Sequence, residues 1–122
     1  MVTLYLLSRE RADQYAALLG LPDMGFSYSS DGWGSMVYTA CLPVGSIKVY
    51  LTQADRLSAT DKRISVEIEW DGLWFQPQEK PDSSLEEIKL RLVQRLVHLK
   101  YEPAIPFLRA HKIDGLFSHL DS

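Results

Sequence analysis

The chain has 122 residues, of which 46% are hydrophobic and 24% are charged, and its formal net charge is −3. These values are ordinary for a soluble globular protein, and the length suits one hydrophobic core, so we expect a single domain over residues 1–122. The mildly acidic balance argues against non-specific nucleic-acid binding, which needs a basic surface.

The sequence also bears on where the protein acts. No apolar run approaches the roughly 18 residues of a membrane helix, so no membrane partner is expected. The opening segment, MVTLYLL, has no basic region and is too short for a signal peptide. Cys41 is the single cysteine and cannot form an internal disulfide, so nothing demands an oxidising compartment. We therefore expect a cytoplasmic protein.

The first quarter of the chain predicts a strand and a helix. Val2–Leu7 is almost entirely apolar, as expected of a strand that is covered on both sides. Ser8 is a suitable N-cap for a helix over Arg9–Leu19, and Gly20 is a suitable residue to end it. The expected buried stripe of this helix consists of Ala12, Tyr15, Leu18 and Leu19. A short strand is expected over Phe26–Ser29.

A hairpin is predicted next. Residues 30–34 have the composition of a turn, with Trp33 near its tip. The strands Met36–Leu42 and Ile47–Thr52 follow, joined by a four-residue loop. That loop length places Leu42 opposite Ile47, Ala40 opposite Val49 and Tyr38 opposite Leu51. The polar-facing side then carries Val37, Thr39, Cys41, Lys48, Tyr50 and Thr52.

The segment from Arg63 to Gln76 gives the strongest structural signal. Ile64, Val66, Ile68 and Trp70 alternate with polar residues, which predicts a strand with one buried face. Asp71-Gly72 tolerates the positive φ values of a type I′ turn. Closing that turn pairs Trp70 with Leu73, Ile68 with Phe75 and Glu69 with Trp74. Trp70 and Phe75 are then expected to be buried, and Trp74 is expected among carboxylates on the exposed face.

The last third of the chain predicts two helices. Ser84 and Glu87 form a capping box before a helix over residues 85–100. Its apolar stripe is Leu85, Ile88, Leu92, Leu96 and Leu99, widened by Val93 and Val97. Pro106 suits the first turn of a second helix over residues 107–112. The order β-α-(β)-β-β-β-β-α-α predicts an α+β fold: a mostly antiparallel meander of four or five strands, with the long C-terminal helix packed on one face.

We find no motif that defines a reaction. Glu67 and Glu69 share one face of a strand, where paired carboxylates can bind a metal, but a solvated strand face explains them more simply. Cys41 has no surrounding nucleophile motif. His98, His111 and His119 lack the spacing of three or four that metal ligands on one helix need. We therefore expect no metal and no cofactor. A non-catalytic role is favoured, and catalysis is left open.

The most informative functional feature is the aromatic content of the expected exposed sheet face. Trp74 and Tyr50, with Tyr28 and Trp33 as further candidates, are typical of interaction surfaces that polar groups surround. The primary hypothesis is a protein-binding module of inhibitor, immunity or regulatory type that uses this face. Its proposed binding residues are Trp74, Trp33, Tyr50, Glu67 and Glu69. The alternative is a small enzyme or ligand-binding domain with a pocket between the sheet and residues 101–120, using Glu67, Glu69 and His111. The oligomeric state is left open.

Overall fold

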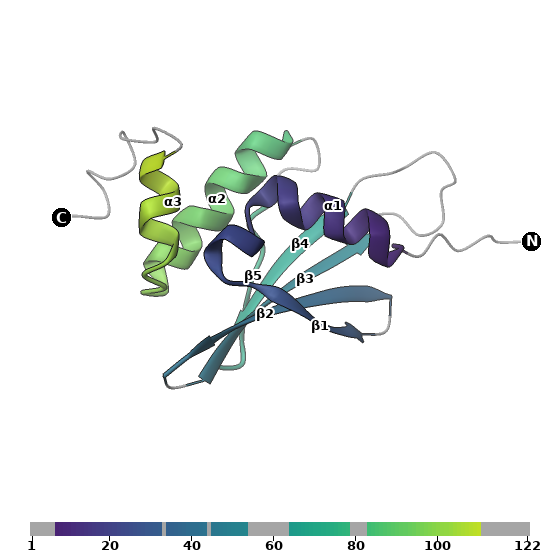
Figure 1. Ribbon diagram of the computed structural model, residues 1–122, viewed down its shortest axis with the longest axis horizontal. Helices are drawn as coiled ribbons and strands as arrows, with labels where there is room; N and C mark the ends of the chain where they lie inside the picture. Colours follow the sequence, from purple (N-terminus) through teal and green to yellow (C-terminus); the bar gives the residue numbers. More distant parts are fainter. Residues whose placement is uncertain (1–6, 33, 44, 54–63, 79–82, 111–122) are drawn as a thin grey trace, which may run out of the picture.

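The computed structural model describes residues 7–32, 34–43, 45–53, 64–78 and 83–110. Within these ranges the strands are β1 (Ser27–Gly32), β2 (Ser35–Leu42), β3 (Gly45–Gln53), β4 (Ile64–Trp70) and β5 (Leu73–Phe75). The helices are α1 (Arg9–Leu19), α2 (Leu85–His98) and α3 (Ala104–Ala110), with a short 3-10 helix, η1, over Pro22–Met24. Figure 1 shows the helices gathered on one side of a single sheet, which confirms the predicted α+β class.

The sheet has five strands in the order β1-β2-β3-β4-β5, and every neighbouring pair is antiparallel. Each strand therefore pairs with its neighbour in the sequence. The predicted strand over Val2–Leu7 lies outside the described residues except for Leu7, so the expected position of that strand stays a prediction. The pairing of β1 with β2 is interrupted by a bulge between Tyr28 and Ser30.

The β4–β5 hairpin confirms the register predicted from the sequence. Asp71 and Gly72 have φ values of 53° and 79°, as a type I′ turn requires. Glu69 pairs with Trp74, and the flanking pairs are Ile68 with Phe75 and Trp70 with Leu73. Trp70 and Phe75 pack against the core but are only partly buried, since β5 forms the edge of the sheet.

The predicted register of the β2–β3 hairpin is wrong by two residues. The structure pairs Leu42 with Gly45 and Ala40 with Ile47, so the loop has two residues instead of four. Gly45 has a φ of 120°, a conformation that favours glycine and lets β3 begin two residues earlier than expected. A shift of two leaves every side chain on its expected face. Lys48 and Tyr50 therefore remain on the face that the sequence predicted.

Helix α1 has the predicted bounds but a different buried stripe. The hydroxyl of Ser8 accepts a hydrogen bond from the Arg11 amide at 3.2 Å, which confirms the N-cap. The buried residues are Ala12, Ala16 and Leu19, which are spaced by four and three and so lie on one side of the helix. Leu18 was expected in the stripe, but it is 55% exposed because it lies about 120° around the helix from the centre of the stripe that Ala12, Ala16 and Leu19 form.

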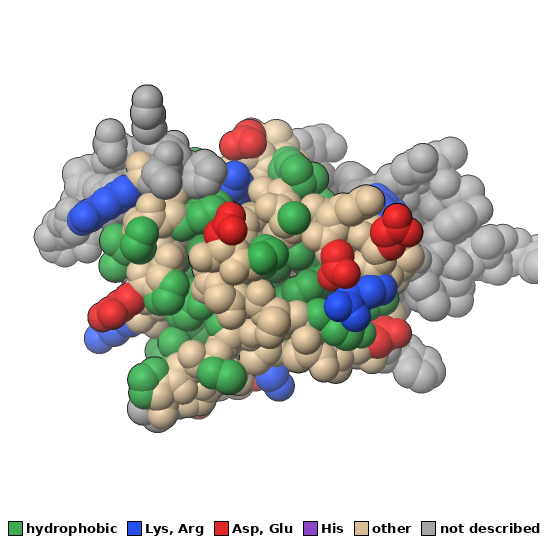
Figure 2. All heavy atoms as spheres, viewed as in Figure 1, with side chains coloured by type: hydrophobic (Ala, Val, Ile, Leu, Met, Phe, Trp, Pro, Cys, Tyr) green, Lys and Arg blue, Asp and Glu red, His purple; other side chains and the backbone are tan. Residues whose placement is uncertain are grey.

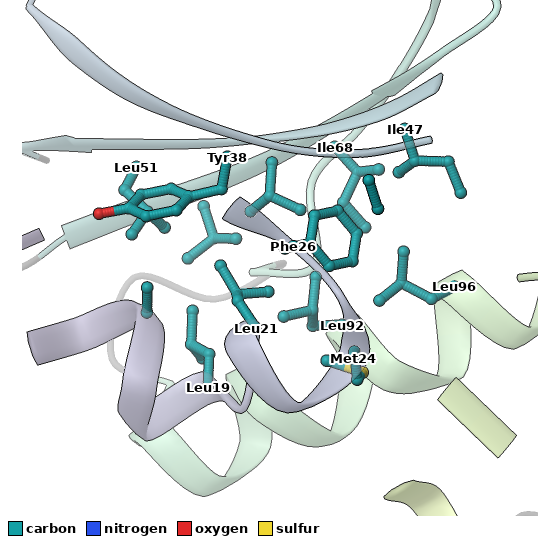
Figure 3. Close-up of a cluster of buried hydrophobic side chains, with 14 of the residues drawn as sticks. Leu19, Leu21, Met24, Phe26, Tyr38, Ile47, Leu51, Ile68, Leu92 and Leu96 are labelled. Atoms are coloured by element: carbon teal, nitrogen blue, oxygen red, sulfur yellow. The ribbon is translucent and has the colours of Figure 1, made fainter. Parts of the chain in front are cut away.

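Helix α2 carries the apolar stripe that the sequence predicted. The hydroxyl of Ser84 accepts a hydrogen bond from the Glu87 amide at 3.2 Å, and the helix ends at His98, two residues before the expected position. The middle of the stripe is fully buried, with Leu92, Val93 and Leu96 at 0% exposure. Figure 3 shows Leu92 and Leu96 directed toward strand residues such as Ile68 and Ile47.

Helix α3 begins at Ala104, three residues earlier than predicted, with Pro106 in its first turn. Tyr101, in the connection between α2 and α3, is buried, and its hydroxyl donates a hydrogen bond to the Met24 carbonyl. Its ring also meets Phe26 edge-to-face at a centroid distance of 5.4 Å. These contacts tie the C-terminal helices to the segment that joins α1 to the sheet.

A side chain completes the outer edge of β4 beyond the short strand β5. The amide of Gln78 accepts a hydrogen bond from the Val66 N–H at 2.7 Å and donates one to the Ile64 carbonyl at 2.9 Å. Both backbone groups lie where β5 no longer pairs with β4. The side chain thus takes the place of a further strand residue and satisfies polar groups that the edge would otherwise leave open.

Candidate functional site

The sheet has one face covered by helices and one face that no described helix or strand covers, which we call the open face (Figure 1). Strand alternation assigns residues to it, because successive side chains point to opposite sides. On β3, Val49 and Leu51 are fully buried in the core, so Lys48 and Tyr50 lie on the open face. The residues assigned to the open face in the three central strands and β5 are Ser35, Val37, Thr39, Cys41, Lys48, Tyr50, Thr52, Ser65, Glu67, Glu69 and Trp74.

Four of the five predicted binding residues come together on the open face. Tyr50 on β3 lies opposite Glu67 on β4, and Glu69 on β4 lies opposite Trp74 on β5. The Tyr50 and Trp74 rings meet at a centroid distance of 4.8 Å with an angle of 46° between their planes. We call these four residues the Trp74 patch. Trp74 is 55% exposed, and the other three are partly exposed.

The two rings meet above β4. Their strands are separated by β4 and so lie two strand spacings apart, roughly 10 Å. A line from Tyr50 to Trp74 crosses β4 between the positions of Glu67 and Glu69. The aromatic pair therefore has one carboxylate on each side of it along β4. Val37, opposite Tyr50 on β2, is 3% exposed, so this part of the open face is also locally apolar.

Two polar side chains border the Trp74 patch. Gln76 donates a hydrogen bond from Nε2 to Oε1 of Glu67 at 3.1 Å. Lys48 lies opposite Glu69 across the β3–β4 pair. Lys48 was predicted on this face from the sequence, whereas Gln76 was not predicted as part of the site. The sequence does contain a sign that Gln76 lies beside Trp74, because residues two apart on a strand share a face.

Two further aromatic residues, Trp33 and Tyr28, were candidates for this surface. The side chain of Trp33 lies outside the described residues, so its predicted binding role stays a prediction. Tyr28 was a candidate for the exposed face, and this is wrong. Tyr28 pairs with Tyr38, and their rings meet at 5.8 Å on the helix-covered face. Tyr28 faces the helices because its cross-strand partner Tyr38 is buried in the core.

The other reactive side chains do not form a site among the described residues. Cys41 is a free, exposed thiol near the end of β2. His98 is exposed at the end of α2, whereas His111 and His119 lie outside the described residues. No group of three potential metal ligands occurs in the described ranges. No helix in those ranges has the length and apolar character needed to cross a membrane.

A second polar cluster, which the sequence analysis missed, lies at the start of α1. The Tyr38 hydroxyl donates a hydrogen bond to Asp13 at 2.6 Å, and Arg9 forms an ion pair with the same carboxylate at 3.0 Å. Arg9 also stacks over the Tyr28 ring at 3.4 Å. Figure 2 shows acidic and basic side chains side by side over this end of α1. The spacing of four between Arg9 and Asp13 was the signal for the ion pair.

The hydrogen bonds of this cluster shift the protonation of its members. The bond from Tyr38, followed by the interaction with Arg9, lowers the pKa of Asp13 below its usual value. Burial, followed by the bond to Asp13, raises the pKa of Tyr38 above its usual value. The cluster joins α1 to β2 with groups that are already paired with one another. This favours a structural role for it over a binding role.

No protein-family model, curated protein or solved structure matches this chain.

Proposed function

We propose that this chain is a non-catalytic protein-binding module, of inhibitor, immunity or regulatory type, and that the open face is its contact surface. The observation that carries the proposal is the exposed Trp74 ring, which packs on Tyr50 away from the core. Tryptophan and tyrosine are the residues that most often dominate binding energy at protein interfaces. A half-exposed tryptophan on a sheet face that the described helices leave uncovered fits that use.

The packing of the two rings adds to this argument. Tyr50 holds the Trp74 ring from one side, so the ring loses less side-chain freedom when a partner covers it. Polar groups surround the pair, as they do at the rim of an interface. Glu67 is also oriented by its hydrogen bond to Gln76. The patch therefore combines an apolar centre with a polar border.

The proposal is tested with Trp74→Ala and a matched control, Leu18→Ala. Both parent side chains are 55% exposed, but Leu18 lies on α1, on the other side of the sheet. Proteins from an extract of the native host are captured on the parent and on both variants, and the candidates are then titrated by calorimetry. We expect Trp74→Ala to weaken binding by about 2 kcal/mol or more, and Leu18→Ala to leave it unchanged. A folded Trp74→Ala protein that binds every partner as the parent does would show that the open face is not the contact surface.

A further inference from the structure

The charges around the aromatic pair are not neutralised within the part of the chain that the structure describes. The ion pair found there joins Arg9 and Asp13, on the opposite side of the sheet. Glu69 makes no hydrogen bond or ion pair with its side chain in that part of the chain, although Lys48 lies across from it. Glu67 accepts one hydrogen bond, from the neutral amide of Gln76. Among the described residues at this surface, two carboxylates, Glu67 and Glu69, accompany one ammonium group, that of Lys48.

The aromatic pair adds further negative electrostatic potential to that of the two carboxylates. The faces of tryptophan and tyrosine rings carry negative electrostatic potential and attract cations within about 6 Å of the ring centre. Here the two rings meet at 4.8 Å and 46°, with Glu67 and Glu69 on either side along β4. A cation against these rings would thus have a carboxylate within reach in both strand directions.

Resting on the function proposed above, we propose that the Trp74 patch binds an extended, arginine-bearing segment of a partner protein. The guanidinium group is planar, stacks on aromatic faces and forms paired hydrogen bonds with carboxylates, so it matches both features of the patch. Glu67 and Glu69 are two residues apart on one strand, which separates them by about 7 Å. Side chains on one face of an extended segment have the same spacing, so two arginines separated by one residue fit the two carboxylates.

Lys48 provides a distinctive expectation for this ligand. Lys48 lies opposite Glu69 across the β3–β4 pair, so its positive charge at the border of the patch repels an incoming cation. Removing the charge of Lys48 should therefore strengthen binding of an arginine-bearing segment. A patch that recognised acidic or purely apolar segments would respond in the opposite way or not at all.

The direct test uses a short capped peptide with two arginines separated by a threonine, and a second peptide with citrulline in place of arginine. Citrulline keeps the planar shape and removes the charge. Binding is followed at low salt by the indole N–H signal of Trp74 in ¹⁵N NMR spectra, assigned by its loss in Trp74→Ala, and affinities are measured by calorimetry. We expect the arginine peptide to shift this signal and the citrulline peptide to leave it in place.

The variants give each group its own expected effect. Trp74→Ala should weaken binding of the arginine peptide about tenfold, as loss of a central aromatic contact does. Glu69→Gln should weaken it about threefold, and Lys48→Gln should strengthen it about twofold, as expected for exposed charges. Leu18→Ala should bind as the parent does. The Glu69→Gln and Lys48→Gln variants keep both rings, so they decide the result even if Trp74→Ala fails to fold.

A selection from a random peptide library separates this inference from the function proposed above. The library is selected on the parent protein and counter-selected on Glu69→Gln and Trp74→Ala. Recovery of arginine-rich peptides supports the inference. Recovery of Trp74-dependent peptides without basic residues overturns the arginine assignment and leaves the open face as a binding surface. Failure of folded parent protein to retain any Trp74-dependent peptide, together with no response to the arginine peptide, overturns both.

Discussion

At the scale of single residues, Gly20 joins two parts of the chain that are far apart in sequence. It ends α1 with a φ of 80°, a conformation that side chains other than glycine rarely adopt. A Cβ atom added there would lie 2.1 Å from Cζ of Phe107 in α3. The end of α1 and the ring of α3 therefore approach each other as closely as the absence of a side chain allows.

This close approach predicts that Gly20→Ala is more destabilising than backbone strain alone explains. Gly72→Ala is the matched control, because Gly72 has a φ of 79° and nothing within 4 Å of an added Cβ. We expect Gly72→Ala to cost about 1 kcal/mol, and Gly20→Ala about 1–3 kcal/mol more because Phe107 must move. Urea denaturation measures both. Equal costs would show that the Phe107 ring yields without loss.

The bond between Tyr38 and Asp13 predicts a pH-dependent stability. The folded state lowers the pKa of Asp13 below its usual value of about 3.9, so this contribution is present above that pH and is lost as pH falls through the folded pKa. The folded state raises the pKa of Tyr38, so that contribution is present below about pH 10 and is lost as pH rises further.

Tyr38→Phe removes the contribution of the tyrosine hydroxyl and leaves Asp13 with only the part that comes from Arg9. We expect it to cost about 1 kcal/mol at pH 7, the usual net value of one hydrogen bond, because Asp13 then has only Arg9 as a partner. That cost should shrink as pH falls through the folded pKa of Asp13, and again as pH rises above about 10, where the unfolded state ionises Tyr38 more readily than the folded state does. Urea titrations of parent and variant across this range measure it. A difference that is the same at every pH would contradict the role given to the Asp13 carboxylate.

At the scale of elements, α2 depends on its apolar stripe. Leu92 and Leu96 are fully buried at its centre, whereas Glu86 is exposed in its first turn. We expect Leu92→Ala and Leu96→Ala each to cost about 2–5 kcal/mol, since each leaves a cavity between the helix and the sheet. Glu86→Ala should cost less than about 1 kcal/mol. Equal denaturation midpoints for the three variants would show that α2 does not pack by this stripe.

The elements differ in how well their sequence predicted them, for identifiable reasons. At Asp71-Gly72 the alternation and the turn chemistry both favour one register, and that register is observed. In the β2–β3 hairpin around Pro43, two registers that differ by two residues both pair apolar residues with apolar residues on the buried face. The alternation of apolar and polar residues therefore does not distinguish between them. The register depends on the positive φ of Gly45. Glycine adopts many backbone conformations, so its presence in the sequence does not show which one it takes.

The same limit applies to the candidate site. Alternation along β3 and β4 was enough to place Tyr50, Glu67 and Glu69 on one face, and the turn added Trp74. The contact between the Tyr50 and Trp74 rings could not be predicted from this alternation. The two residues lie two strands apart, so their contact depends on the direction in which the side chains lean. Leu18 shows the converse case, since it was expected to be buried next to Leu19 but is 55% exposed, and the apolar spacing alone does not show how wide the buried stripe of α1 is.

At the scale of the whole molecule, the order of the strands has a kinetic consequence. Each strand of the sheet pairs with the strand next to it in sequence. Within the described sheet, no strand pairing therefore joins elements that are far apart along the chain. Loop-closure entropy is smallest for such nearby contacts, and folding rates rise as the average sequence separation of contacts falls. The β4–β5 hairpin, closed by a two-residue turn, is a natural place for the folding nucleus to form. A sheet assembled by successive hairpins should thus fold faster than β-sandwiches of similar length, whose strands must find partners far along the chain.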